Sequence, residues 1–183
     1  MSIYDYEARF GASDKTTKAM KAAIEDWFRL YYGDNAQVDR DPSQRIAYTV
    51  VNKLVKAMFA EYSAAAGDRS YQHLVDALDE QKKAAVQLAL VGGECYLKPW
   101  PNEEGFGFTL IPRDHILIFG RSAEGEPVDV GTVERSAAGK FFYTLLERRT
   151  LDGSGILTIT NHLYRSGEQD SLGTQVSLQE HPA

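Results

Sequence analysis

Apolar residues recur at every third or fourth position through the first half of the chain and at every second position through much of the second half. The first spacing is typical of amphipathic helices and the second of half-buried strands. We therefore predict a helical portion over residues 13–92 and an antiparallel sheet over residues 93–165. The predicted fold class is α+β, with three helices followed by a β-meander of about six strands.

The first two predicted helices have recognisable ends. Ser13-Asp14 can cap the first helix, and Gly33 would end it. Asp41-Pro42 is a good start signal for the second helix, because proline in the first turn has no helical hydrogen bond to lose. This helix is predicted to continue through Ile46–Tyr62. Its apolar face is so wide that we expect more than one side of it to be covered.

The third helix leads directly into the strands. It is predicted to open at Ser70 and to stop at Gly92-Gly93, because glycine adopts the left-handed conformation that ends a helix without a steric penalty. Short alternating segments separated by turn residues follow. The predicted strands are Cys95–Trp100, Phe106–Ile111, His115–Phe119, Val128–Glu134, Phe141–Arg149 and Ile156–Tyr164.

The two ends of the chain show no clear periodicity. Residues 1–12 resemble an arm that carries Tyr4, Tyr6 and Phe10, and residues 166–183 form a polar tail that we expect to be weakly structured. A length of 183 residues suits one domain, so residues 1–183 are predicted to form a single α+β domain.

Composition and charge narrow the class of protein. Hydrophobic residues make up 43% of the chain and charged residues 25%, which is an ordinary globular mixture. The net charge of −6 argues against a general nucleic-acid binder, because an acidic protein repels a phosphate backbone. The single cysteine, Cys95, cannot form a disulfide within the chain, which fits a reducing compartment. No apolar run has the length of a signal peptide or a membrane span, so we expect a soluble protein with no membrane partner.

Residues that often carry catalysis are scattered. Ser154 lies in an Asp-Gly-Ser-Gly turn, which lacks the Gly-x-Ser-x-Gly spacing of a serine hydrolase. Cys95 follows a helix C-terminus beside Glu94, a setting that disfavours a thiolate. Glu103-Glu104 lie on a turn and are expected to be solvated. We therefore predict no catalytic, cofactor-binding or metal-binding residue and no cofactor. The histidines, none of them at metal-ligand spacing, are His73, His115, His162 and His181.

Basic residues form three short clusters, each interleaved with acidic residues. This mixture favours a solvated face over a nucleic-acid site. If a cluster touched DNA, it would act through phosphates and without sequence preference, so no DNA-binding residue is assigned. The clusters are Lys15/Lys18/Lys21, Lys82-Lys83 and Arg148-Arg149.

Five stretches, taken in order and with their spacing, resemble the portal protein family of tailed phages and prophages. No single stretch is diagnostic, but together they cover nearly the whole chain from about Ala22 onward. They are Trp27-Phe28 with Tyr31-Tyr32-Gly33; the Ile46–Tyr62 helix with its VNKLVKAMFAE core; LALVGGECYLKPW at the helix-to-strand joint; Phe108–Asp114; and the meander GEPVDVGTVERS, KFFYTLLERRTL and ILTITNHLYRS, followed by Leu172–Leu178.

The resemblance implies a structural protein and not an enzyme. Portal subunits form a ring, usually of twelve copies, at one vertex of the capsid, and double-stranded DNA passes through its channel during packaging and ejection. Their partners are the terminase motor, the major capsid protein and head-completion proteins. The location implied is the virion, after assembly in the bacterial cytoplasm. Family members usually continue beyond the Leu172–Leu178 segment, so we expect this chain to represent the N-terminal, wing-type portion.

Two other functions remain open from the residues alone. The chain could be a stand-alone phage head or tail adaptor, or another interaction module, with the same order of helices and strands. It could also be a small hydrolase whose site no motif reveals. An exposed apolar face on Ile46–Tyr62 would favour an assembly protein, because partner subunits would cover it. A deep pocket with convergent carboxylates or histidines would favour the hydrolase.

Overall fold

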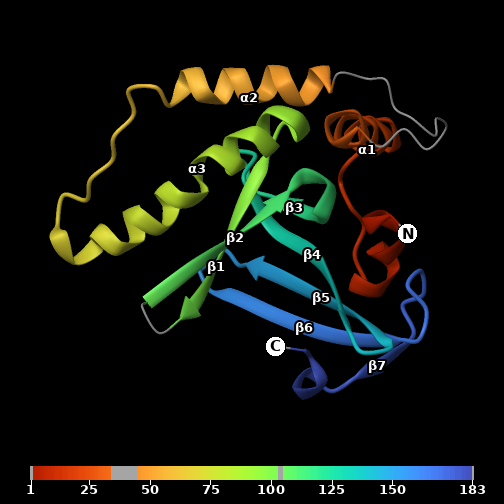
Figure 1. The fold of residues 1–183 in the computed structure, drawn as a ribbon. Helices are drawn as coiled ribbons and strands as arrows, with labels where there is room; N and C mark the ends of the chain where they lie inside the picture. Colours follow the sequence, from red (N-terminus) through yellow and green to blue (C-terminus); the bar gives the residue numbers. More distant parts are fainter. Residues whose placement is uncertain (1, 34–44, 103–104, 183) are drawn as a thin grey trace. The chain divides into compact units, whose positions relative to one another are not determined.

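Helices precede strands along most of the chain, so the predicted α+β class is confirmed (Figure 1). The structure is a computed structural model that describes residues 2–33, 45–102 and 105–182. The chain divides into two compact units. We call Lys18–Asp114 the helical unit, and Met1–Thr17 together with His115–Ala183 the sheet unit.

The helical unit is built around its longest helix, α3. This helix contacts the other two helices and both strands of a hairpin. In the hairpin Trp100 pairs with Gly107, and a side chain on Gly107 would collide with the Trp100 ring. The elements are α1 (Lys18–Tyr32), α2 (Ile46–Met58), the 3-10 helix η2 (Arg69–Tyr71), α3 (Gln72–Gly92), β1 (Cys95–Asn102) and β2 (Gly105–Pro112), followed by the 3-10 helix η3 (Arg113–His115).

The sheet unit contains a five-stranded antiparallel meander. Each strand pairs with the next along the chain, in the order β3-β4-β5-β6-β7. A 3-10 helix from the N-terminus packs on this sheet. The elements are η1 (Ile3–Phe10), β3 (Ile116–Arg121), β4 (Pro127–Ala138), β5 (Phe141–Leu151), β6 (Leu157–Ser166), β7 (Thr174–Val176) and η4 (Leu178–Glu180).

The strands form two sheets, although we predicted one sheet over residues 93–165. β1 and β2 form a separate two-stranded sheet. Along the chain, η3 follows directly after Pro112 and separates β2 from β3. The β1–β2 hairpin then packs against α3. The antiparallel meander itself is confirmed.

Two helix boundaries differ from the prediction. α1 begins at Lys18 and not near Ser13-Asp14, because the Asp14 carboxylate accepts hydrogen bonds from the backbone N–H groups of Thr16 and Ile118. α2 ends at Met58 and not at Tyr62. The Phe59 and Tyr62 rings there pack edge-to-face, with centroids 5.2 Å apart.

Other predicted helix ends are confirmed. Gly33 follows α1 with a φ of 74°, and Gly93 follows α3 with a φ of 83°. Both values lie in the left-handed region that glycine tolerates. Asp41-Pro42 lies outside the described residues, and α2 is described from Ile46.

The arm and the tail both have regular structure, which their lack of periodicity does not predict. Residues Ile3–Phe10 of the arm form η1, and the tail contributes β7 and η4, so the expectation of a weakly structured tail is wrong. η1 covers the sheet because Tyr6 and Phe10 are buried in one cluster with Leu117. The full cluster of buried residues is Ile3, Tyr6, Phe10, Leu117, Phe119, Val133 and Leu146.

Candidate functional site

An apolar groove lies between the three helices of the helical unit. It has a volume of about 580 Å³. Its walls include large side chains that remain exposed, with Trp27 at 41%, Leu30 at 60% and Leu90 at 45% of their full accessible area. The lining residues are Trp27, Leu30, Tyr31, Ala47, Val50, Val51, Leu90, Val91 and Gly93.

The groove continues onto an exposed apolar ridge on α2. Ile46, Val50, Leu54 and Met58 follow one another at intervals of four, so they form one line along the helix. Their exposed fractions are 67%, 50%, 50% and 59%. In contrast, Val55 is the buried residue of α2. We call these four side chains the α2 ridge.

Few contacts hold α2 against its neighbours. Val55 is 2% exposed and anchors the helix. The Gln87 side chain of α3 donates a hydrogen bond to the Asn52 side chain of α2. The ring of Tyr31 on α1 lies 5.5 Å from the ring of Tyr48 on α2. The rest of α2 is largely left to solvent, which is unusual for a helix with so many apolar residues.

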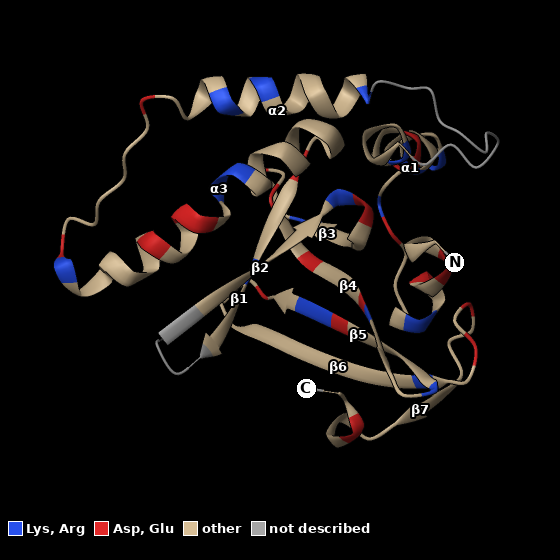
Figure 2. Ribbon diagram, in the orientation of Figure 1, with Lys and Arg blue, Asp and Glu red and all other residues tan. Residues whose placement is uncertain are grey.

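Charge on α2 has one sign. Lys53 and Lys56 are the charged residues within Ile46–Met58, and no acidic residue occurs in this segment. Figure 2 shows the helix mostly tan, with isolated blue segments. The lysines keep part of this helix charged, and its ridge offers a continuous apolar line to a partner.

The groove lining has no group suited to acid–base chemistry. Tyr31 is its one ionisable side chain. Burial and the neighbouring Tyr48 phenol raise the pKa of Tyr31, so this phenol stays neutral at neutral pH. Among the described residues, no carboxylate or histidine lines the groove. The arrangement can therefore bind an apolar surface but offers no means of transferring a proton near pH 7.

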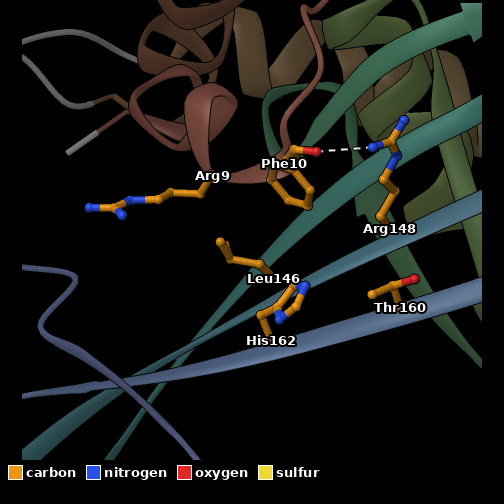
Figure 3. A pocket seen from close by; sticks show the side chains of 6 residues that line it. All are labelled: Arg9, Phe10, Leu146, Arg148, Thr160 and His162. Atoms are coloured by element: carbon orange, nitrogen blue, oxygen red, sulfur yellow. Dashed lines mark hydrogen bonds between the residues drawn. The ribbon is translucent and has the colours of Figure 1, made fainter.

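A smaller pocket lies in the sheet unit, between η1 and strands β5 and β6 (Figure 3). Its volume is about 130 Å³. The Arg9 side chain points away from the pocket, and Arg148 turns toward the Phe10 carbonyl oxygen, to which it donates a hydrogen bond of 2.9 Å. Arg148 also donates two hydrogen bonds to the Asp129 carboxylate, at 2.9 and 2.7 Å. These contacts fasten the arm to the sheet, and they leave the cation of Arg148 neutralised.

The contact between Asp129 and Arg148 shifts the pKa values of both side chains. The hydrogen bonds from Arg148 lower the pKa of Asp129, and the same contact raises the pKa of Arg148. Thr150 adds a further hydrogen bond to the Asp129 carboxylate at 3.1 Å. The pair is thus a structural element of the sheet unit and not a catalytic acid.

The structure places most candidate catalytic residues in structural roles. Burial raises the pKa of the Cys95 thiol, which disfavours a thiolate, as its sequence position indicates. Ser154 donates a hydrogen bond to the Asp152 carboxylate in the turn between β5 and β6, as expected for a hairpin. Glu103 and Glu104 lie outside the described residues.

Within the described ranges, no group of three or more histidine, cysteine or acidic residues is arranged to hold a metal ion. The histidines occupy separate places: His73 is in α3, His115 in η3, His162 in β6, and His181 just after η4. The Nδ1 atom of His162 lies 3.3 Å from the side-chain amide of Gln175 on β7.

Two of the basic clusters are engaged in ion pairs within the protein. Arg148 pairs with Asp129, and Arg149 pairs with Glu147 at 2.7 Å. Lys82 pairs with Asp79 and lies over the Tyr62 ring. These contacts support a structural role for the two clusters over a role in binding phosphates.

No model of a known protein family and no curated protein matches the chain. In the part of the chain that the structure describes, no helix combines the length and the apolar character needed to cross a membrane.

The sequence predicts the apolar stripes of the helices but not which part of them remains exposed. The width of the apolar face on Ile46–Tyr62 predicts that more than one side of this helix is covered. Within the described residues, one side of α2 packs on α1 and α3, and the α2 ridge stays open. The useful signal was the width of the apolar face, which exceeds what two neighbouring helices can cover.

Proposed function

We propose that this chain is a structural protein of the tailed-phage portal family, part of the ring at the head–tail vertex through which DNA is packaged and ejected. The proposal begins from the five ordered stretches that resemble that family. The observation that carries it further is the α2 ridge with the adjoining groove. In a ring, a neighbouring copy would cover this surface.

Burial of the α2 ridge would supply the driving force for assembly. Removing apolar surface from water contributes about 25 cal/mol per Å². Side chains at half to two-thirds exposure, repeated along four turns of one helix, offer a continuous strip for this purpose. The interior of a specific interface is typically apolar, with charge at its rim. Lys53 borders the ridge, which fits that pattern, whereas Lys56 lies farther round the helix.

The same surface suits a phage head or tail adaptor, which also assembles through apolar contacts. The two functions differ in the assembly that they produce. A small hydrolase is the less favoured candidate, because the groove is lined by apolar side chains and lacks carboxylates and histidines.

The test is electron microscopy of the native gene product. Rings with a central hole are expected. A well-behaved monomer would contradict the portal proposal. One or a few copies bound to a preformed ring of another protein would instead identify an adaptor. For the 183-residue chain alone, we expect a monomer or heterogeneous oligomers by light scattering, and a sharp dodecamer would contradict that expectation.

A matched pair of variants tests the role of the α2 ridge. Leu54→Lys places a charge at the centre of the ridge, and Leu178→Lys makes the same change in η4 of the sheet unit. Both leucines are 50% exposed, so the folding cost should be similarly small. Leu54→Lys should abolish ring formation, whereas Leu178→Lys should retain it. Rings that form equally well in both variants would show that α2 is not the assembly surface.

A further inference from the structure

β6 leaves most of its outer edge without a strand neighbour. β7 pairs with β6 over three residues, from Leu163↔Val176 to Arg165↔Thr174. Among the described residues, no strand pairs with that side of Leu157–His162. Leu157–Asn161 are all exposed, including Leu157 at 51% and Ile159 at 46%.

The hairpin geometry shows which backbone groups point outward from this edge. Asp152 donates its backbone N–H to the carbonyl oxygen of Ile156, at 3.0 Å. In an antiparallel pair, hydrogen-bonded residues alternate along each strand. Thr158 and Thr160 therefore bond inward to β5, while the N–H and C=O groups of the odd-numbered residues Leu157, Ile159 and Asn161 point outward.

This edge lacks the usual protection against strand pairing. Natural edge strands carry charges, proline or bulges that prevent association. Leu157–His162 contains no Lys, Arg, Asp, Glu or Pro, and β6 is almost entirely tan in Figure 2. Its composition, two aliphatic residues and two threonines in six, has high β-propensity.

The opposite edge of the same sheet is closed. The backbone N–H of Ile118 in β3 donates to the Asp14 carboxylate at 3.1 Å, and the Ile118 carbonyl accepts from the Lys15 N–H at 2.7 Å. Asp14 and Lys15, which follow the arm, therefore occupy the β3 edge at Ile118. Head-to-tail pairing of β6 with the β3 edge of another copy is blocked by this contact, which also prevents open-ended growth.

We propose that the free edge of β6 pairs with β6 of a second copy of this chain, antiparallel and about a two-fold axis. The axis passes between Ile159 and Ile159 of the partner, with Thr158 opposite Thr160 of the partner. Because directly opposite residues lie on the same face of a sheet, this register places Ile159 against Ile159 of the partner, with Leu157 on the same face and opposite Asn161 of the partner. Leu151, which pairs with Leu157 and is 43% exposed, extends the apolar strip.

The sequence of the edge is self-complementary, which is why a second copy fits it. The two threonine positions form hydroxyl pairs across the axis on one face, and Ile159 meets Ile159 of the partner on the other, flanked by Leu157 and Asn161. No charge opposes a charge of the same sign. A two-fold contact closes at two copies, so it differs from a ring contact and does not depend on the proposed portal function.

Hydrogen exchange followed by NMR tests the pairing at single amides. In the unpaired chain, the amides of Leu157, Ile159 and Asn161 exchange rapidly, while those of Thr158 and Thr160 are protected by β5. When the protein concentration is raised from about 20 µM to about 1 mM, exchange of the odd-numbered amides should slow severalfold, up to about sevenfold, because the monomer fraction falls at most as the square root of the concentration. Sedimentation velocity on the same samples should report a dimer.

Two Ile→Lys variants provide the control. Ile159→Lys places a charge on the free edge and should remove both the dimer and the slowing of the odd-numbered amides. Ile46→Lys makes the same change on α2 and should retain both, even where it prevents ring assembly. Odd-numbered amides that exchange equally fast at all concentrations would overturn the proposal and leave the edge open to a strand of another protein. A dimer lost in Ile46→Lys but kept in Ile159→Lys would also overturn it.

Discussion

The junction between α3 and β1 offers a sharp test of the packing, through the substitution Gly92→Ala. Gly92 is the last residue of α3 and is buried. A Cβ atom at this position would lie 2.7 Å from the Cβ of Arg113 and 2.8 Å from Cε2 of Phe28. Carbon atoms in contact normally lie about 3.5–4.0 Å apart. The new methyl group therefore requires a shift of about 1 Å by an α1 ring, by η3, or by both.

The expected cost follows from two opposing effects. Overpacking of a well-filled site costs about 1–3 kcal/mol. Replacing glycine by alanine in a helix gains up to about 1 kcal/mol, and less at a helix end. We therefore expect Gly92→Ala to destabilise the helical unit by about 1–2 kcal/mol. With a urea m-value of about 2 kcal/mol/M, the midpoint would fall by about 0.5–1 M.

Tryptophan fluorescence during urea unfolding measures this change, because both tryptophans, Trp27 and Trp100, lie in the helical unit. Gly67→Ala is the matched control. It has open space around the new Cβ, and its φ is not in the left-handed region, so it should be neutral or slightly stabilising. A Gly92→Ala protein as stable as the unmodified chain would refute the argument that Phe28 and Arg113 leave no room for a methyl group.

Two further expectations concern the sheet unit. Phe10→Ala removes a ring that is 9% exposed and whose centroid lies 5.3 Å from that of Phe119. We expect the free energy of unfolding to fall by about 3–5 kcal/mol and the arm to be cleaved faster by proteases. A fall below about 1 kcal/mol, measured by urea unfolding followed by tyrosine circular dichroism, would contradict the burial of η1. Asp129 has a lowered pKa in the folded state, so its contribution to stability is complete above the unfolded pKa of about 4 and is lost as the pH falls through the folded value. Asp129→Asn should therefore lower the free energy of unfolding by about 1–2 kcal/mol at pH 7, and its melting temperature should fall less as the pH is lowered. Asp26→Asn breaks an exposed pair with Arg29 and should change the stability and its pH dependence much less.

Local features of the chain were predictable from the sequence. The end of α3 at Gly92-Gly93 and the turn at Asp152–Gly155 depend on residues close together in the sequence, because a left-handed glycine or an aspartate side chain acts within one turn. The order of strands in the meander was predictable for the same reason: short loops can join only neighbouring antiparallel strands.

The surfaces that the proposals use were decided by tertiary structure. Periodicity shows that Val50 and Val55 both belong to an apolar face, but only the packing of α2 on α1 and α3 decides that Val55 is buried and Val50 half exposed. Likewise, the alternation of Leu157–His162 predicts a strand but not that β7 pairs with β6 only beyond this segment, at Leu163–Arg165.

The sequence by itself determined the end of α3, the approximate positions of strands β1 to β6, and that the strands are antiparallel. Only the tertiary structure decided that η1 packs on the sheet, that β1 and β2 form a sheet of their own, and that the α2 ridge and the β6 edge stay open among the described residues. The physical reason is the distance along the chain over which each kind of interaction acts. Turns and caps are set by neighbours in sequence, whereas coverage of a face depends on which distant segments can reach it and fill the space.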